Sequence, residues 1–156
     1  MYLDERNEFC DAVSINTGAA GAYNMGDVID LGPVSRDIGS GQPLYLVISV
    51  DTGIAAAGAG TLQFNLVSDS QDPMATNGTQ SIHFSTGAIA TGTATGTTTL
   101  KAGTVLAAVA LPMEGAVYKR YLGIQQVTAA ANVTAGKFNA FLTPDVSRYR
   151  AYPQGF

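Results

Sequence analysis

The sequence of 156 residues predicts an all-β fold, an antiparallel β-sandwich of the jelly-roll type formed by a single domain, residues 1–156. Gly contributes 18 residues and Thr is frequent, a composition that favours short strands joined by turns over helices. Apolar segments of strand length recur between clusters of turn-forming residues. Only 13% of the residues are charged, and a chain of this length can bury a core without disulfides.

Residues 44–69 are predicted to form the centre of the sandwich. Residues 44–50 (LYLVISV) are apolar at almost every position and rich in β-branched side chains, which is typical of a central strand covered on both faces. Residues 61–69 (TLQFNLVSD) alternate apolar and polar side chains, as in a strand with one buried face. We expect the two strands to form a long hairpin with a mobile tip at residues 53–60.

The N-terminal part of the chain is predicted to form an extended arm, residues 1–26, before the first strand. Residues 1–13 favour a short helix because acidic side chains occupy its first turns and apolar ones recur at helical spacing. Residues 14–26 are small, polar and Gly-rich, and predict an extended arm or loop. Residues 27–31 are expected to form a short strand that ends at Gly32-Pro33, and residues 36–43 are expected to form a turn.

The sequence from residue 69 onward predicts a loop, four further strands and a C-terminal tail. Residues 69–78 are dense in turn formers, whereas the low-complexity segment 87–103 is either an edge strand or a loop. Residues 145–156 are expected to form a tail outside the core. The four strands are expected at residues 80–86, 104–111, 120–129 and 137–143.

Charge is unevenly distributed along the chain, whose net charge is −4. Residues 1–37 contain seven acids and two bases, whereas residues 101–156 contain six bases and two acids. These charges either lie on solvated loops or pair with a neighbouring subunit. The net charge and the lack of a dense basic surface disfavour nucleic acid as a partner.

The cellular location is predicted from what the chain contains. No apolar run approaches the length of a membrane span, and the acidic N-terminus differs from a signal peptide. The single cysteine, Cys10, rules out an intrachain disulfide. We therefore expect a soluble protein, made in a reducing cytoplasm, that does not contact a membrane.

The residues predict no catalytic, cofactor or metal site. His83 is the only histidine, and its strand-like context SIHFS predicts a packed or partly exposed residue. Acidic neighbours should raise the pKa of the Cys10 thiol, which predicts an inert thiol. Asp69, Asp72 and Asn77 miss the spacing of a calcium loop, so turn formation is the better interpretation.

One tripeptide, Asp51-Thr52-Gly53, resembles the active-site motif of aspartic proteases. Two such carboxylates at a dimer axis would share a proton and activate water. Here Ile54 follows the glycine where those enzymes have a small residue, and the polar residues that usually come next are missing. Asp51 is therefore interpreted as the first residue of a hairpin loop, and a dimeric aspartic protease using Asp51 is kept as an alternative.

Several blocks together carry a resemblance to a known family. They are LDERNEFCDA, VIDLG, RDIGSGQPLYLVISV, TLQFNLVSDSQ, YLGIQQV, FLTPD and RAYPQGF, in this order. In these blocks the chain resembles capsid cement (decoration) proteins of tailed bacteriophages, including short-tailed Bordetella phages. The resemblance implies a jelly-roll homodimer without enzyme activity or cofactor. It would be made in the bacterial cytoplasm, bind the outer surface of an icosahedral head and bridge major capsid protein subunits against DNA pressure.

The two ends of the chain are the expected contact regions, because their aromatic and charged residues lie outside the strand pattern. Which end contacts the capsid and which the partner subunit stays open. A carbohydrate-binding jelly roll is an alternative, although Trp, a common sugar platform, is absent. The residues expected at the capsid or dimer interface are Leu3, Phe9, Arg148, Tyr149, Arg150, Tyr152 and Phe156.

Overall fold

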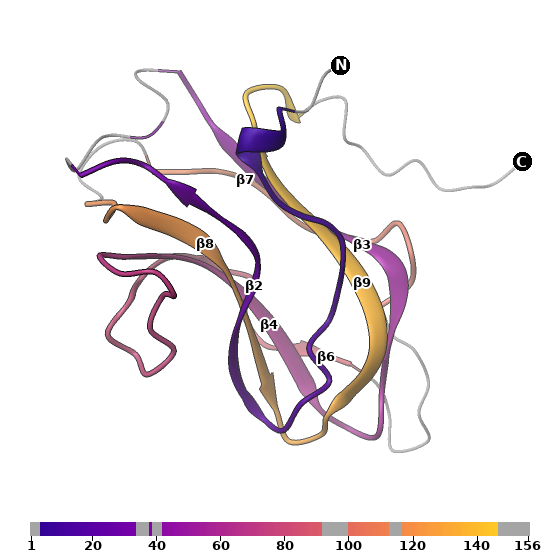
Figure 1. Ribbon diagram of the computed structural model, residues 1–156. Helices are drawn as coiled ribbons and strands as arrows, with labels where there is room; N and C mark the ends of the chain where they lie inside the picture. The colour runs from indigo at the N-terminus through magenta and orange to yellow at the C-terminus, as the bar shows by residue number, and fades with distance from the viewer. Residues whose placement is uncertain (1–3, 34–37, 39–41, 92–99, 113–116, 147–156) are drawn as a thin grey trace, which may run out of the picture.

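The protein forms two antiparallel β-sheets that face each other, as the computed structural model in Figure 1 shows. The structure describes residues 4–33, 38, 42–91, 100–112 and 117–146. A 3₁₀ turn, η1 (Glu5–Asn7), precedes the first strand. In order, sheet A contains β1 (Glu8–Ser14), β9 (Val133–Thr143), β3 (Tyr45–Ala56) and β7 (Val105–Ala110). Sheet B contains β2 (Gly21–Asp30), β8 (Tyr121–Ala129), β4 (Thr61–Asp69) and β5 (Ser81–Ser85), with β6 (Ile89–Ala90) also paired to β4.

The hydrophobic core lies between the sheets, because strands of both sheets turn alternate side chains toward each other. Phe64 of β4 packs against Phe138 of β9 with ring centroids 4.5 Å apart. Leu46 of β3, Leu62 of β4 and Ile124 of β8 are fully buried in the same cluster. The expected all-β sandwich is therefore confirmed, and its jelly-roll type stays a prediction.

The prediction that residues 44–69 form a hairpin at the centre of the sandwich is wrong. β3 pairs with β9 and β7, whereas β4 pairs with β8, β5 and β6, so the chain crosses between the sheets after Ala56. Much of the expected mobile tip is strand, since β3 continues to Ala56 and Ile54 is fully buried. An alternating pattern identifies one buried face, but two strands can bury such faces in one core from opposite sheets.

The N-terminal segment contains two strands that the sequence pattern did not predict. The helix expected at residues 1–13 is wrong, because residues 4–13, the part of this segment that the structure describes, contain the 3₁₀ turn η1 and then β1, which pairs with β9. The loop expected at residues 14–26 is also partly wrong, because β2 begins at Gly21 and pairs with β8. Irregularities in the ladders explain both errors. The register of β1 shifts twice, and that of β2 shifts between Met25 and Ile29, so neither strand keeps a simple alternation.

The other strands lie close to their expected positions. β3 is a central strand, as predicted for residues 44–50, and β5, β7, β8 and β9 correspond to the four later strands. Residues 69–78 contain a loop after the last residue of β4, as their turn formers predicted. Most of the turn expected at 36–43 and part of the segment 87–103 lie outside the described residues. In the described part of the chain, no helix is long and apolar enough to cross a membrane.

At one side of the sandwich, the edge strands β1 and β2 lie next to each other. The buried side chain of Gln126 in β8 holds the chain where it passes from one sheet to the other. Its Oε1 accepts a hydrogen bond from the Asn16 N–H, at 2.8 Å, and its Nε2 donates to the Asn16 carbonyl oxygen, also at 2.8 Å. These two hydrogen bonds fix the connection between β1 and β2 at Asn16.

Candidate functional site

Phe9 is the one predicted interface residue that the structure describes, and it is a core residue. Its side chain is 1% exposed and belongs to the hydrophobic core between the sheets. The prediction that Phe9 contacts a neighbour is therefore corrected. The reason is that Phe9 lies in β1, which pairs with β9, and not in a free arm. Outside the described residues lie Leu3, Arg148, Tyr149, Arg150, Tyr152 and Phe156.

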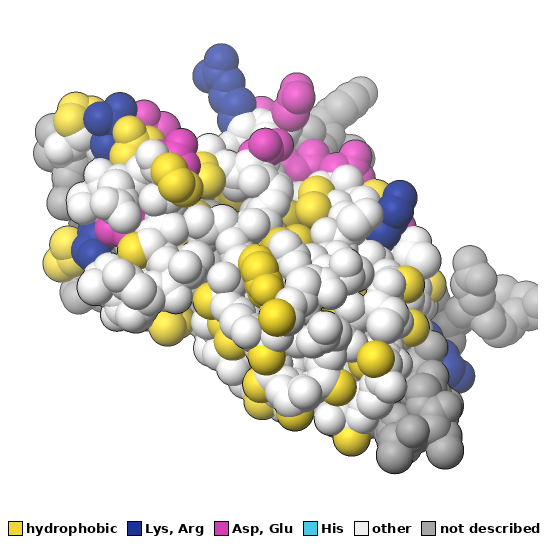
Figure 2. Space-filling model, turned by 60° about the horizontal axis from the view of Figure 1, so that its bottom comes forward, with side chains coloured by type: hydrophobic (Ala, Val, Ile, Leu, Met, Phe, Trp, Pro, Cys, Tyr) yellow, Lys and Arg dark blue, Asp and Glu magenta, His cyan; other side chains and the backbone are white. Residues whose placement is uncertain are grey.

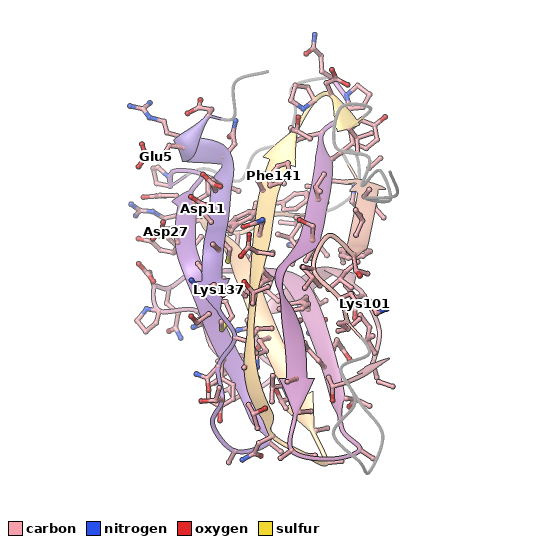
Figure 3. The ribbon with its side chains drawn as sticks, turned by 90° about the vertical axis from the view of Figure 1, so that its right-hand side faces the viewer. Glu5, Asp11, Asp27, Lys101, Lys137 and Phe141 are labelled. Carbon is pink, nitrogen blue, oxygen red and sulfur yellow. The ribbon has the colours of Figure 1, made fainter. Side chains whose placement is uncertain are left out.

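Four carboxylates gather where β1 and β2 lie side by side, a surface called here the acidic edge: Glu5, Glu8, Asp11 and Asp27. Figure 3 shows three of them at this side of the sandwich, and Figure 2 shows acidic side chains along one rim of a face that otherwise carries few charges. Partial burial, and then the charges of Asp11, Glu5 and Asp27, raise the pKa of Glu8. None of the four forms an ion pair with a described residue. Such a surface favours contact with basic side chains.

Opposite charges of described residues pair within the molecule in two places, and one of these pairs, Arg120 with Asp30, joins the two ends of the chain. Arg120 donates from Nε and Nη2 to the two carboxylate oxygens of Asp30, at 2.9 and 2.8 Å, and its guanidinium lies over the ring of Tyr121. Its hydrogen bonds, with one from the Gly32 N–H, lower the pKa of Asp30 to about 2. Lys119 Nζ lies 3.9 Å from Asp69 Oδ1. Part of the charge complementarity between the two ends is thus satisfied inside one chain.

A buried polar network holds the loop at residues 70–80 against the outer face of sheet B. The fully buried Gln125 donates from Nε2 to Asn24 Oδ1, at 2.8 Å, and to the Ala75 carbonyl oxygen, at 2.7 Å. Its Oε1 accepts a hydrogen bond from Gln80 Nε2 at 3.0 Å. The sequence reasoning missed this network. The signal for it was the Gln125-Gln126 pair inside an otherwise apolar strand.

The same loop explains the role of Asp69 and of a glycine in β8. The carboxylate of Asp69 accepts hydrogen bonds from the N–H groups of Ala75 and Ser70, at 2.9 and 2.7 Å. These bonds, led by that from Ala75, lower the pKa of Asp69. Met74 packs where a Cβ at Gly123 would lie. Asp69 therefore stabilises a turn, and no cluster of potential metal ligands occurs among the residues that the structure describes.

His83 belongs to a packed cluster beside this loop. Its Nε2 lies 2.7 Å from Ser68 Oγ, and its ring stacks on Tyr118 with centroids 4.0 Å apart. Ser68 Oγ also accepts a hydrogen bond from the Lys119 N–H at 3.0 Å. Burial, and then the charge of Lys119, lower the pKa of His83. Ser68 is fully buried, so its hydroxyl joins strands and is not exposed to a substrate.

Cys10 and Asp51, the remaining candidates for chemistry, lie in β1 and β3. Burial, followed by the charges of Asp27 and Glu8, raises the pKa of the Cys10 thiol to about 12. The predicted upward shift is confirmed, but burial is the larger cause. Asp51 does not begin a hairpin loop, because it lies within β3. Its exposed carboxylate accepts a hydrogen bond from Thr52 Oγ1 at 3.0 Å.

The comparisons with known proteins agree with an origin in a bacteriophage. The model of the family Bbp16, whose name is that of a Bordetella phage protein, matches residues 9–142. A search of curated proteins finds no significant match to the chain. The matched region runs from β1 into β9 and so includes strands of both sheets. Because this region covers most of the sequence, the protein belongs to the Bbp16 family of phage proteins.

Proposed function

We propose that this protein is a structural virion protein that cements the phage head. It binds the outer surface of the icosahedral shell as a homodimer, bridges neighbouring major capsid protein subunits and helps them resist the pressure of packaged DNA. It does so without catalysis, cofactor, nucleic acid or membrane. The observation that carries the proposal is the match of both sheets to a phage protein family.

The polar groups of the described residues support adhesion as the function. Gln125, Gln126 and Asp69 hold backbone segments in place, and His83 and Ser68 bond to each other inside the fold. The acidic edge, in contrast, has no ion pair with a described residue and suits a basic partner. A protein present in many copies on one shell gains avidity from modest contacts, because each bound site raises the effective concentration of the next.

The direct test is to mix the purified protein with undecorated heads. Cement function predicts that the protein sediments with the heads and that decorated heads withstand higher temperature or stronger osmotic shock. An Asp11→Asn and Asp27→Asn double variant tests the acidic edge, and Asp51→Asn is the matched control, because Asp51 is an exposed carboxylate on another strand. Heads that neither bind the wild type nor gain resistance would reject the function.

Truncations test the expected terminal contacts. Removing residues 1–3 or 147–156 leaves every described strand intact, whereas removing residues 1–12 would delete most of β1 together with Phe9. We expect both shorter chains to keep the unfolding midpoint of the wild type and to bind heads more weakly. Full binding by both would reject a role of the termini.

A further inference from the structure

β7 is the outermost strand of sheet A on the side opposite β1. Leu111 donates its N–H to the Leu44 carbonyl oxygen at 2.8 Å, and Leu46 and Ile48 lie opposite Val109 and Ala107. Hydrogen-bonded pairs alternate with unbonded pairs in an antiparallel ladder. The N–H and C=O groups of Ala108 and Ala110 therefore point away from β3, and no described residue pairs with them.

This edge lacks most of the features that keep edge strands from pairing. Natural proteins protect such edges with charged side chains, proline or bulges. β7 reads VLAAVA, with neither charge nor proline, and its bulge is confined to the start of the strand, at Leu106. Ala108 and Ala110 are exposed and small, so another backbone can approach closely. The outward-pointing groups of Ala108 and Ala110, which no described residue pairs with, repeat at the two-residue spacing of a β-strand, so the backbone of a second strand can pair with both.

We propose that β7 pairs with β7 of a second copy of this chain, antiparallel across a two-fold axis at Val109. Ala108 of each copy then lies opposite Ala110 of the other, and each such pair exchanges both of its N–H···O hydrogen bonds. Sheet A becomes continuous through the dimer in the order β1-β9-β3-β7-β7-β3-β9-β1. The inference rests on the homodimer of the proposed function and specifies its interface.

Three observations favour a second copy as the occupant of this edge. Two copies related by a two-fold axis present the same unpaired row, so one contact satisfies both. The partly buried Val109 packs against the core, and its counterpart would cover it and extend the core. Each copy carries a net charge of −4. The acidic edge lies at one side of sheet A and β7 at the other, and Figure 3 shows Lys101 on the side away from the acidic edge. Pairing through β7 therefore keeps the two acidic edges far apart.

Proline at position 108 tests the pairing. The N–H of Ala108 points outward, so Ala108→Pro removes a donor to the second copy without removing a bond to β3. Ala108→Ser is the matched control, because it keeps the N–H. In sedimentation equilibrium, we expect the apparent mass of the wild type and of Ala108→Ser to rise with concentration from 16.1 kDa toward twice that mass. The apparent mass of Ala108→Pro should stay at 16.1 kDa. Unfolding midpoints of all three verify that each variant is folded.

Ala108→Lys provides a second test that leaves the backbone donor in place. Its charged side chain should weaken the dimer, and more so at low salt. Slow hydrogen exchange of the amides at positions 108 and 110, lost on dilution, is expected for the wild type and for Ala108→Ser, and exchange should be faster in Ala108→Lys. A wild type that remains monomeric, or an Ala108→Pro variant that dimerises like the wild type, overturns the inference.

Binding to heads is measured separately, so that the two proposals fail in different ways. If the wild type decorates heads while folded Ala108→Pro dimerises normally, the β7 pairing is rejected and the cement function stands. If Ala108→Pro abolishes the dimer while the wild type does not bind heads, the pairing is supported and the cement function is rejected.

Discussion

Gly26 and Gly32 provide a matched pair of substitutions that tests the contact between β1 and β2. Both have a positive φ, 63° at Gly26 and 89° at Gly32. A Cβ at Gly26 would overlap the Phe9 carbonyl oxygen and lie 2.6 Å from Cys10 Sγ, whereas a Cβ at Gly32 would meet no atom within 4 Å. Alanine at either position strains the backbone, but only Gly26→Ala also forces β1 and β2 apart.

The expected free energies follow from these contacts. Holding alanine in the left-handed conformation destabilises the folded state by about 1–2 kcal/mol. Alanine also lowers the conformational entropy of the unfolded chain, which offsets about 0.4–1 kcal/mol of this cost. Gly32→Ala should therefore lower the free energy of unfolding by about 1 kcal/mol. At Gly26, overpacking destabilises the folded state by about 1–3 kcal/mol more. The upper part of that range applies because the new Cβ would overlap a backbone atom, the Phe9 carbonyl oxygen, which cannot move aside as a side chain can. We expect Gly26→Ala to be less stable than Gly32→Ala by about 2–3 kcal/mol.

Urea unfolding of the wild type and both variants measures the difference directly. A second readout is the reactivity of Cys10, because displacement of β1 from β2 should expose this buried thiol in Gly26→Ala and not in Gly32→Ala. Equal stabilities of the two variants, with Cys10 equally protected, would refute the close approach of Phe9 to Gly26.

Three further predictions concern titratable side chains. Because the folded state lowers the pKa of His83, it binds fewer protons than the unfolded state, and stability should fall as pH decreases through about 6.5 toward the folded pKa. His83→Gln should flatten this pH dependence in urea unfolding. The Cys10 thiol, with a pKa of about 12, should resist thiol reagents near pH 8 in the native protein and react rapidly once unfolded, as a time course in denaturant would show. The ion pair of Asp30, whose pKa is lowered from 3.8 to about 2, should stabilise the protein above pH 3.8 and lose this effect as pH falls toward 2. Asp30→Asn should remove that acid-sensitive component, and salt should reduce it, in unfolding curves measured between pH 2 and 5.

The later strands could be predicted from the sequence because they are bounded by strong turn signals. In β8 and β9, apolar residues either alternate with polar ones or form a continuous run between two turn signals. Both patterns favour a β-strand. The sheet to which a strand belongs was not predictable in the same way. β3 and β4 turn similar apolar faces to one core from opposite sheets, and side-chain alternation is identical in both cases.

The first two strands were missed for a local reason. In β1 the consecutive residues Phe9 and Cys10 are both buried, because the register shifts between Glu8 and Cys10 and Ala12 has a φ of 47°. The apolar residues of this segment consequently follow neither the strand period nor a true helix. This is also why Phe9 looked like a contact residue on a free arm.

The candidate surface was predicted in part. Excess acid near the N-terminus was evident, and so was a raised pKa for Cys10. The gathering of Glu8 and Asp11 with Asp27 depends on β1 and β2 being neighbours at the edges of different sheets. That proximity arises from the tertiary structure, because each of the two strands pairs with a strand from the C-terminal part of the chain.

The pairing of β1 with β9 and of β2 with β8 has a consequence for biosynthesis. A nascent chain keeps its first two strands without their ladder partners until residues 121–143 have left the ribosome. At about 5–20 residues per second, this exposes their backbone edges for several seconds in every round of translation. The ladders that hold β1 and β2 in the two sheets can therefore form only late in synthesis, once β9 and β8 are available.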